Sequence, residues 1–135
     1  MTIPKKEDYI FYQGQKFQIE FYFTETGKTP AKEYLETTSL NVKTKLAALV
    51  KYIGENGKIF DIEKFRLVDA VEKIFEFKPL QYRFFNFFHK GGKIIITNGY
   101  IKKSRKVSKK DLERAKELKK DYIYRVKRGD YYEKR

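Results

Sequence analysis

The sequence feature that most restricts the fold is a pair of apolar segments joined by a glycine-rich turn. Residues 81–88 and 93–101 are each long enough to form a strand, and Gly91 and Gly92 lie between them. Consecutive glycines tolerate the positive φ angles that tight hairpin turns require. We therefore predict an antiparallel β-hairpin at the centre of the fold.

Two hairpin turns are compatible with these segments, and they differ in the residue that lies opposite Arg83. A four-residue turn places Arg83 opposite Asn98, whereas a turn made of the two glycines alone places it opposite Tyr100. Directly opposed residues of an antiparallel pair point to the same face of the sheet. Either turn therefore predicts that Arg83 shares a face with Asn98, Tyr100 and, if the alternation continues, Lys102.

The remaining chain predicts further strands and three helices. We expect strands over residues 16–23 and 72–78, helices over 30–36 and 39–54, and a last helix that runs from a Ser108–Asp111 capping box to about residue 126. Residues 59–71 fit a loop with a short helical turn. The fold class is thus α+β, with an antiparallel sheet, two N-terminal helices packed on one face and a C-terminal helix.

The length of 135 residues is that of one domain. We predict a single domain over residues 1–135, with a core from about 9 to 126 and loose ends. The N-terminus has no apolar run of signal-peptide length, and no window approaches the ~20 apolar residues of a membrane span. We therefore expect a cytoplasmic protein.

Positive charge is concentrated in the hairpin and in the segment that follows it. The chain carries a net charge of +13, and residues 77–110 contain ten Lys or Arg and no Asp or Glu. A local cationic field on an aromatic sheet suggests a site for a polyanion such as a nucleic acid.

Metal and thiol chemistry have little support in the composition. The chain has no cysteine and one histidine, His89. A zinc site would have to rest mainly on carboxylates, which residues 77–110 lack. We expect no metal and no cofactor. His89 would lie ~20 Å from Arg83 along a strand that rises ~3.3 Å per residue, so we predict an exposed turn histidine and not a general base.

The residues around the hairpin resemble those of the RelE-like toxins of bacterial type II toxin-antitoxin systems, and in particular the HigB-like branch, which includes many phage-derived proteins. The matching residues are Glu76-Phe77-Lys78, Arg83 with Phe84 to Phe88, Tyr100 to Ser104, Lys106 and Ala115. The order of the elements also agrees over residues 16–123. The sequence differs from the family at Lys78, where arginine is preferred, and at Ser108, where proline is common.

This resemblance implies a RelE-like fold and a metal-independent mRNA endoribonuclease, or mRNA interferase, that cuts messages on the ribosome and inhibits translation. It also implies a cognate antitoxin, often a helix-turn-helix protein as in the HigA-like group. RNA cleavage without a metal requires deprotonation of the 2′-hydroxyl, stabilisation of the phosphorane and protonation of the 5′-oxygen.

Arg83 is the candidate for stabilising the phosphorane. A general acid or base comes from Lys78, Tyr100, Lys102 and Lys103, whose roles the sequence does not apportion; we expect neighbouring cations to lower the pKa of such lysines and of the tyrosine. Candidate RNA-binding residues are Lys64, Arg66, Arg105, Lys106 and Lys109.

Three alternatives remain open from the sequence. Arg83 could pair with Glu76 in place of a ligand phosphate. The chain could be a non-catalytic ParE-like toxin or a simple nucleic-acid-binding module on the same fold. It could also be a degenerate prophage remnant that retains only antitoxin binding.

Overall fold

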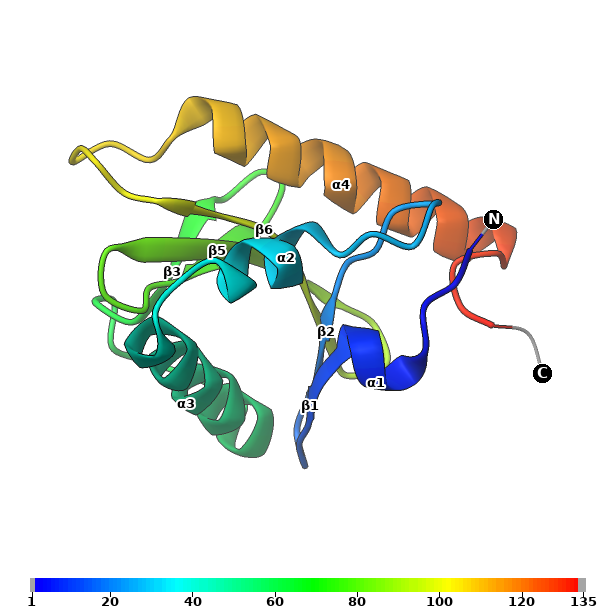
Figure 1. Ribbon diagram of the computed structural model, residues 1–135, viewed down its shortest axis with the longest axis horizontal. Coiled ribbons are helices and arrows are strands. Elements are labelled where there is room, and N and C mark those ends of the chain that lie inside the picture. The colour runs from blue at the N-terminus through cyan, green and yellow to red at the C-terminus, as the bar shows by residue number, and fades with distance from the viewer. Residues whose placement is uncertain (1, 134–135) are drawn as a thin grey trace.

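A computed structural model describes residues 2–133 as a six-stranded sheet between helices (Figure 1). The strands are β1 (Ile10–Gln13), β2 (Gln18–Phe21), β3 (Phe65–Asp69), β4 (Ile74–Phe77), β5 (Tyr82–His89) and β6 (Lys93–Ile101), and the helices are α1 (Lys6–Tyr9), α2 (Pro30–Glu36), α3 (Leu40–Asn56) and α4 (Lys109–Arg128). The predicted helices and the central hairpin are confirmed. Met1 and the tail residues 134–135, which we expected to be loose, lie outside the described residues.

The sheet is mixed and not wholly antiparallel, which corrects the sequence prediction. Its order is β1-β2-β6-β5-β4-β3, and the one parallel pair is β2 with β6. The chain leaves β2, passes through α2, α3 and the β3–β5 antiparallel strands, and then returns along β6 in the same direction as β2. Residues 59–71, which we expected to be a loop, contain strand β3.

The hairpin turn differs from both predictions, although Arg83 lies opposite Tyr100 as the two-glycine turn predicted. Next to the turn His89 lies opposite Lys93, which leaves a three-residue turn that neither alternative describes. Thr97 is an extra residue on β6, and this β-bulge shifts the register so that Arg83 lies opposite Tyr100. The bulge also changes which β6 side chains face each side of the sheet, so it is what brings Tyr100 to the side of Arg83.

Helices cover both faces of the sheet (Figure 1). α2 packs against β6, and α3 packs against β1 and β2. The apolar residues of the two helices form one core with Phe84 and Ile96. α4 packs on β6 and β5 from the opposite face, where Ala115 and Tyr122 belong to a second core with Phe85 and Phe87. The arrangement departs from the simple pair of N-terminal helices that we predicted, because α1 is an additional short helix and α2 packs mainly on β6 whereas α3 packs on β1 and β2.

The chain ends are more ordered than the sequence predicted. Tyr9, at the end of α1, is buried. Tyr131 is buried as well: its ring stacks on Phe23, and its hydroxyl accepts a hydrogen bond of 2.9 Å from the Phe23 amide. Aromatic residues therefore hold the segment after α4 against the sheet. Within residues 2–133, no helix combines the length and the apolar character that a bilayer crossing requires.

Candidate functional site

The candidate site is a cavity at the end of the sheet where β5 begins and β6 finishes. The cavity has a volume of about 310 Å³ and is lined by Tyr100, Ile101, Lys103, Ser104, Lys106, Val107, Ser108 and Asp111. It lies on the α4 side, between the last residues of β6, the basic loop that follows and the first turn of α4. The local sequence explains this position, because the apolar alternation of β6 stops at Lys102 and the N-cap of α4 is Ser108.

Arg83 lies on the same face as this cavity, directly opposite Tyr100. The arginine is 9 % exposed, and its Nη1 donates to the carbonyl oxygens of Leu80 and Tyr82 at 2.7 and 2.8 Å. Its Nε has no hydrogen-bond partner among the described residues. Two backbone carbonyls therefore fix Nη1, and because Nε is buried, Nη2 is the donor left for an anionic ligand.

Glu76, the alternative partner of Arg83, is fully buried and pairs with a different arginine. Its Oε2 lies 2.7 Å from Nε of Arg66, while its Oε1 has no partner among the described residues. The two residues lie opposite each other in β4 and β3. Arg66, which we predicted to bind RNA, therefore has a structural role that neutralises much of its charge.

Tyr100 is buried between the sheet and the start of α4. Its ring stacks on Phe85 with centroids 5.4 Å apart, and its hydroxyl accepts a hydrogen bond of 3.4 Å from the Ser108 amide. Burial raises the pKa of Tyr100 above its ordinary value, and the charge of Glu76 acts in the same direction; the Ser108 amide and Arg83 only partly oppose this rise. Our prediction of a lowered tyrosine pKa was wrong, because desolvation outweighs the nearby cations.

The N-terminus of α4 contributes dipoles and backbone amides to the cavity. Ser108 Oγ accepts from the Asp111 amide at 3.3 Å and donates to the Asp111 carboxylate at 2.6 Å. The predicted capping box is therefore only half formed, since the Ser108 amide bonds to Tyr100 instead of to the carboxylate. A helix N-terminus favours a bound anion. Sequence reasoning treated Ser108 and Asp111 only as a cap; their place directly after the basic run was the available signal that they also line the site.

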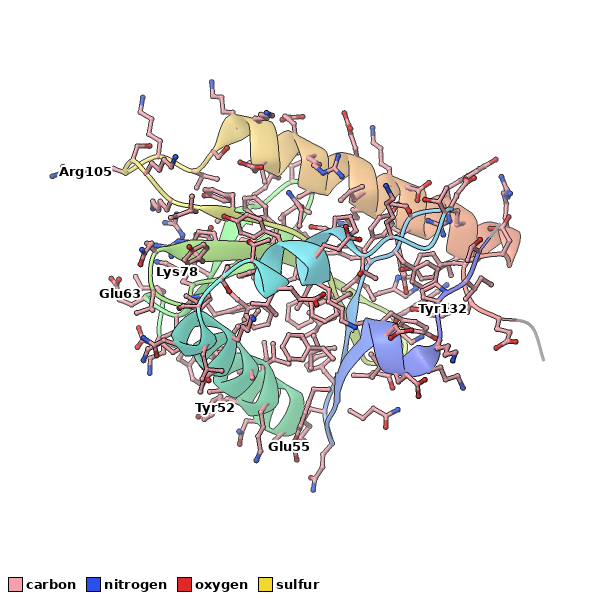
Figure 2. The ribbon with its side chains drawn as sticks, in the orientation of Figure 1. Tyr52, Glu55, Glu63, Lys78, Arg105 and Tyr132 are labelled. Atoms are coloured by element: carbon pink, nitrogen blue, oxygen red, sulfur yellow. The ribbon has the colours of Figure 1, made fainter. Side chains whose placement is uncertain are left out.

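The basic loop supplies several long, cationic side chains around the cavity. Lys103 and Lys106 line it, and Arg105 projects from the loop tip into solvent (Figure 2). Lys102 follows β6, where its amide donates to the Gln81 carbonyl at 2.7 Å, and Lys109 is an exposed residue of the first turn of α4. The structure thus gathers the predicted cations of residues 102–109 at the same end of the sheet as Arg83.

Lys78 and Lys64 lie elsewhere, on the α3 side of the sheet end. They line a separate depression of about 310 Å³ together with Lys45 and Leu80. The Lys78 ammonium donates to the Ile62 carbonyl at 2.9 Å. Burial, followed by the charges of Arg66 and Arg83, lowers the pKa of Lys78, in the predicted direction. Neither lysine lines the cavity at Tyr100.

His89 lies at the opposite end of the hairpin, as its spacing from Arg83 required. It is half-buried and meets the Tyr122 ring edge-on at 5.0 Å, so the prediction of an exposed turn histidine was wrong. Burial and the charges of Lys90 and Lys93 lower its pKa.

The comparison with protein families gives one match. The model of the family described as "Phage derived protein Gp49-like (DUF891)" matches residues 33–120, a range that runs from α2 into α4 and includes Arg83, Tyr100 and the basic loop. No curated protein matches the sequence.

Proposed function

The chain belongs to the family of phage-derived Gp49-like proteins, which is associated with RelE-type toxins, and on this basis we propose that it is the toxin of a type II toxin-antitoxin system and cleaves mRNA on the ribosome. The observation that supports cleavage best is the pairing of Arg83 with Tyr100 beside a cavity lined by lysines. This arrangement offers a fixed cation, a hydroxyl donor and flexible ammonium groups to one phosphodiester.

The proposed reaction is a transfer within the RNA. The 2′-oxygen attacks the phosphorus and the bond from phosphorus to the 5′-oxygen breaks, which leaves a 2′,3′-cyclic phosphate and a 5′-hydroxyl. Arg83 stabilises the negative charge of the phosphorane through the guanidinium donors that the carbonyls leave free. The positive end of α4 adds to the same field.

Proton transfer is assigned by the state of each group at neutral pH. Tyr100 keeps its proton because its pKa is raised, so it serves as a donor toward the 5′-oxygen. Lys103 lines the same cavity and is the candidate that contacts the phosphate and accepts the 2′-hydroxyl proton. Lys102 is the alternative to Lys103 in this role.

The message would continue across the basic loop. Arg105, Lys106 and Lys109 are placed to contact phosphates beyond the scissile one, with a salt-dependent contribution to affinity. Lys78 would contact the RNA on the α3 side of the same sheet end. The partners in this proposal are therefore mRNA on the ribosome, in the cytoplasm, and a cognate antitoxin of the HigA-like, helix-turn-helix kind.

Expression in a bacterial host tests the proposal. We expect the parent protein to arrest growth and to produce messages cut within their reading frames, as mapped by sequencing of RNA 5′ ends. Arg83→Ala and Lys103→Ala should relieve the arrest, whereas Lys120→Ala, which removes an exposed lysine of α4, should not. Circular dichroism checks that each variant folds.

Two results would contradict the proposal. Growth arrest with uncut messages and damaged DNA would favour a ParE-like topoisomerase poison. Arrest that persists when Arg83 and Lys103 are both replaced would show that the site lies elsewhere.

A further inference from the structure

A second surface, on the outer side of α3, carries an apolar groove. A cavity of about 410 Å³ is lined by Ala48, Leu49, Tyr52, Ile59, Phe60, Asp61 and Lys64. Two smaller depressions, of about 310 and 260 Å³, adjoin it and share Ala48 with it. The groove thus extends along α3 from Lys45 to Asn56, on the face of the sheet opposite to α4.

α3 uses one apolar stripe in the core and carries two further apolar residues on its outer side. Val42, Leu46, Val50 and Ile53 face the sheet and are buried. Ala48 and Tyr52 are spaced four residues apart on the outer side, where Figure 2 shows Tyr52 projecting away from the sheet. Together with Ile59 and Phe60, these two side chains give the cavity a mainly apolar lining.

The groove gathers large apolar side chains that are strongly exposed. Of the residues that line it, Phe60 is 86 % exposed and Tyr52 is 55 % exposed. Leu80, which lines the adjoining depression, is also exposed. Single exposed apolar residues are ordinary on protein surfaces, but a contiguous group around a groove marks an interaction site.

The charge around the groove is positive and uncompensated. Among residues 2–133, no carboxylate lies within ion-pair distance of Lys45, Lys51 or Lys64. Asp61 and Glu55 also line the groove and keep their negative charge, since they hydrogen-bond to neutral donors, but the lysines outnumber them.

We propose that this groove binds an acidic amphipathic helix of a partner protein. Residues 45 to 56 span about three helical turns, or ~16 Å, which matches a short docking helix. The exposed alanines of α3 allow a second helix to approach to the usual 8–10 Å between axes. Acidic side chains on the flanks of that helix would face Lys45, Lys51 and Lys64. An RNA strand fits less well, because the floor of Ala48, Leu49 and Ile59 offers its phosphates no hydrogen-bond donor, whereas a helix can bury apolar side chains there.

The inference does not depend on RNA cleavage, since α3 and the cavity at Tyr100 lie on opposite faces of the sheet. Arg83→Ala should leave helix binding unchanged, and Phe60→Ser should leave RNA cleavage unchanged. Failure of one proposal is therefore distinguishable from failure of the other.

A synthetic peptide serves as the probe. It carries leucines at helical i, i+3, i+4 and i+7 spacing and glutamates on the remaining faces; a control peptide of the same composition has its leucines distributed around the helix. We expect fluorescence anisotropy to show tighter binding of the amphipathic peptide, and NMR shift changes to fall on α3 and residues 59–64. Phe60→Ser should weaken binding at least about tenfold, since buried aromatic anchors dominate such interfaces.

Matched variants separate specific from general effects. Val71→Ser removes an apolar side chain that is 89 % exposed in the turn between β3 and β4, and it should not alter binding. Lys45→Gln with Lys64→Gln should weaken binding and reduce its salt dependence, whereas Lys120→Gln with Lys127→Gln on α4 should have little effect.

Four results would overturn the proposal. The first is equal binding of the two peptides, and the second is an equal effect of Phe60→Ser and Val71→Ser on peptide binding. The third is self-association of the protein that Phe60→Ser abolishes. The fourth is that single-stranded RNA, in place of the peptide, shifts the NMR signals of the amides of α3 and residues 59–64. The third result would assign the groove to a second copy of the chain, and the fourth to RNA.

Discussion

Tyr100→Phe separates the chemical role of this residue from its structural one. The substitution keeps the ring that stacks on Phe85 and removes only the hydroxyl, whose one hydrogen bond in the structure is the 3.4 Å contact from the Ser108 amide. A protein hydrogen bond contributes about 0.5–1.5 kcal/mol net, and this long one should lie at the lower end. We therefore expect the free energy of unfolding to fall by less than about 1 kcal/mol.

The expected effect on cleavage is much larger. Loss of a general acid lowers a rate by about 10²- to 10⁴-fold, which corresponds to roughly 3–5 kcal/mol of activation free energy. By contrast, Tyr100→Ala removes the buried ring, and aromatic truncations of this kind cost about 3–5 kcal/mol of stability. The phenylalanine variant is thus the one that should be folded and inactive.

Urea denaturation and single-turnover cleavage of a ribosome-bound message measure the two quantities. Because burial raises the pKa of Tyr100 above its ordinary 10.0, the hydroxyl should stay protonated up to at least about pH 9. Below that pH, Tyr100→Phe should lower the cleavage rate by the same factor at every pH. Cleavage within threefold of the parent rate would refute the proposed role. The reasoning that burial raises the pKa of Tyr100 would be refuted if the cleavage rate of the parent protein changed with an apparent pKa below 10 and this change were absent in Tyr100→Phe.

Three further substitutions test the packing and electrostatics. Gly99→Ala would place a methyl group 2.7 Å from Cε1 of Phe84, and this overpacking should lower the free energy of unfolding by about 1–3 kcal/mol in urea denaturation. Ser108→Ala removes the oxygen that accepts from the Asp111 amide and should cost about 1 kcal/mol by the same assay. The pKa of His89 in the folded protein is below its unfolded value of 6.5, so the unfolded chain binds the proton more strongly. The free energy of unfolding should therefore fall as the pH drops through about 6.5. In His89→Gln, this free energy should fall less between pH 7.5 and 5.5.

Each of these substitutions has a control or a contradicting outcome. Ser104→Ala changes an exposed loop serine and should alter stability by less than about 0.5 kcal/mol. A Gly99→Ala variant as stable as the parent would show that the Phe84 ring moves easily. An unchanged pH dependence in His89→Gln would mean that other groups account for the acid sensitivity.

Local sequence patterns predicted most of the elements. The 3.6-residue periodicity of α3 and α4, the serine at each N-cap and the glycines at positions 57 and 129 define both helices closely. The strands of the central hairpin were also placed within a residue or so. Short strands were harder: β1 and β3 are formed through pairing with β2 and β4, and their own sequences carry too few residues to show a period.

The candidate site depends on interactions that no local pattern reveals. The bulge at Thr97 adds one residue to β6, and through it Tyr100 faces Arg83. Glu76 pairs with Arg66 and not with Arg83, because the register of β3 against β4 brings those two side chains together. Lys78 has a lowered pKa as expected but faces α3, since the strand ends just before it.

The sequence by itself determined which segments become helices or strands and where the cationic charge is concentrated, because periodicity, caps and composition act over neighbouring residues. The sequence also predicted that Tyr100 shares a face with Arg83, but only the tertiary structure decided which arginine pairs with Glu76, that a bulge sets the register at Tyr100, and in which direction the pKa of Tyr100 moves. The physical reason is that burial and Coulomb interactions depend on distances between residues far apart in the chain, and these distances are set when strands and helices pack together.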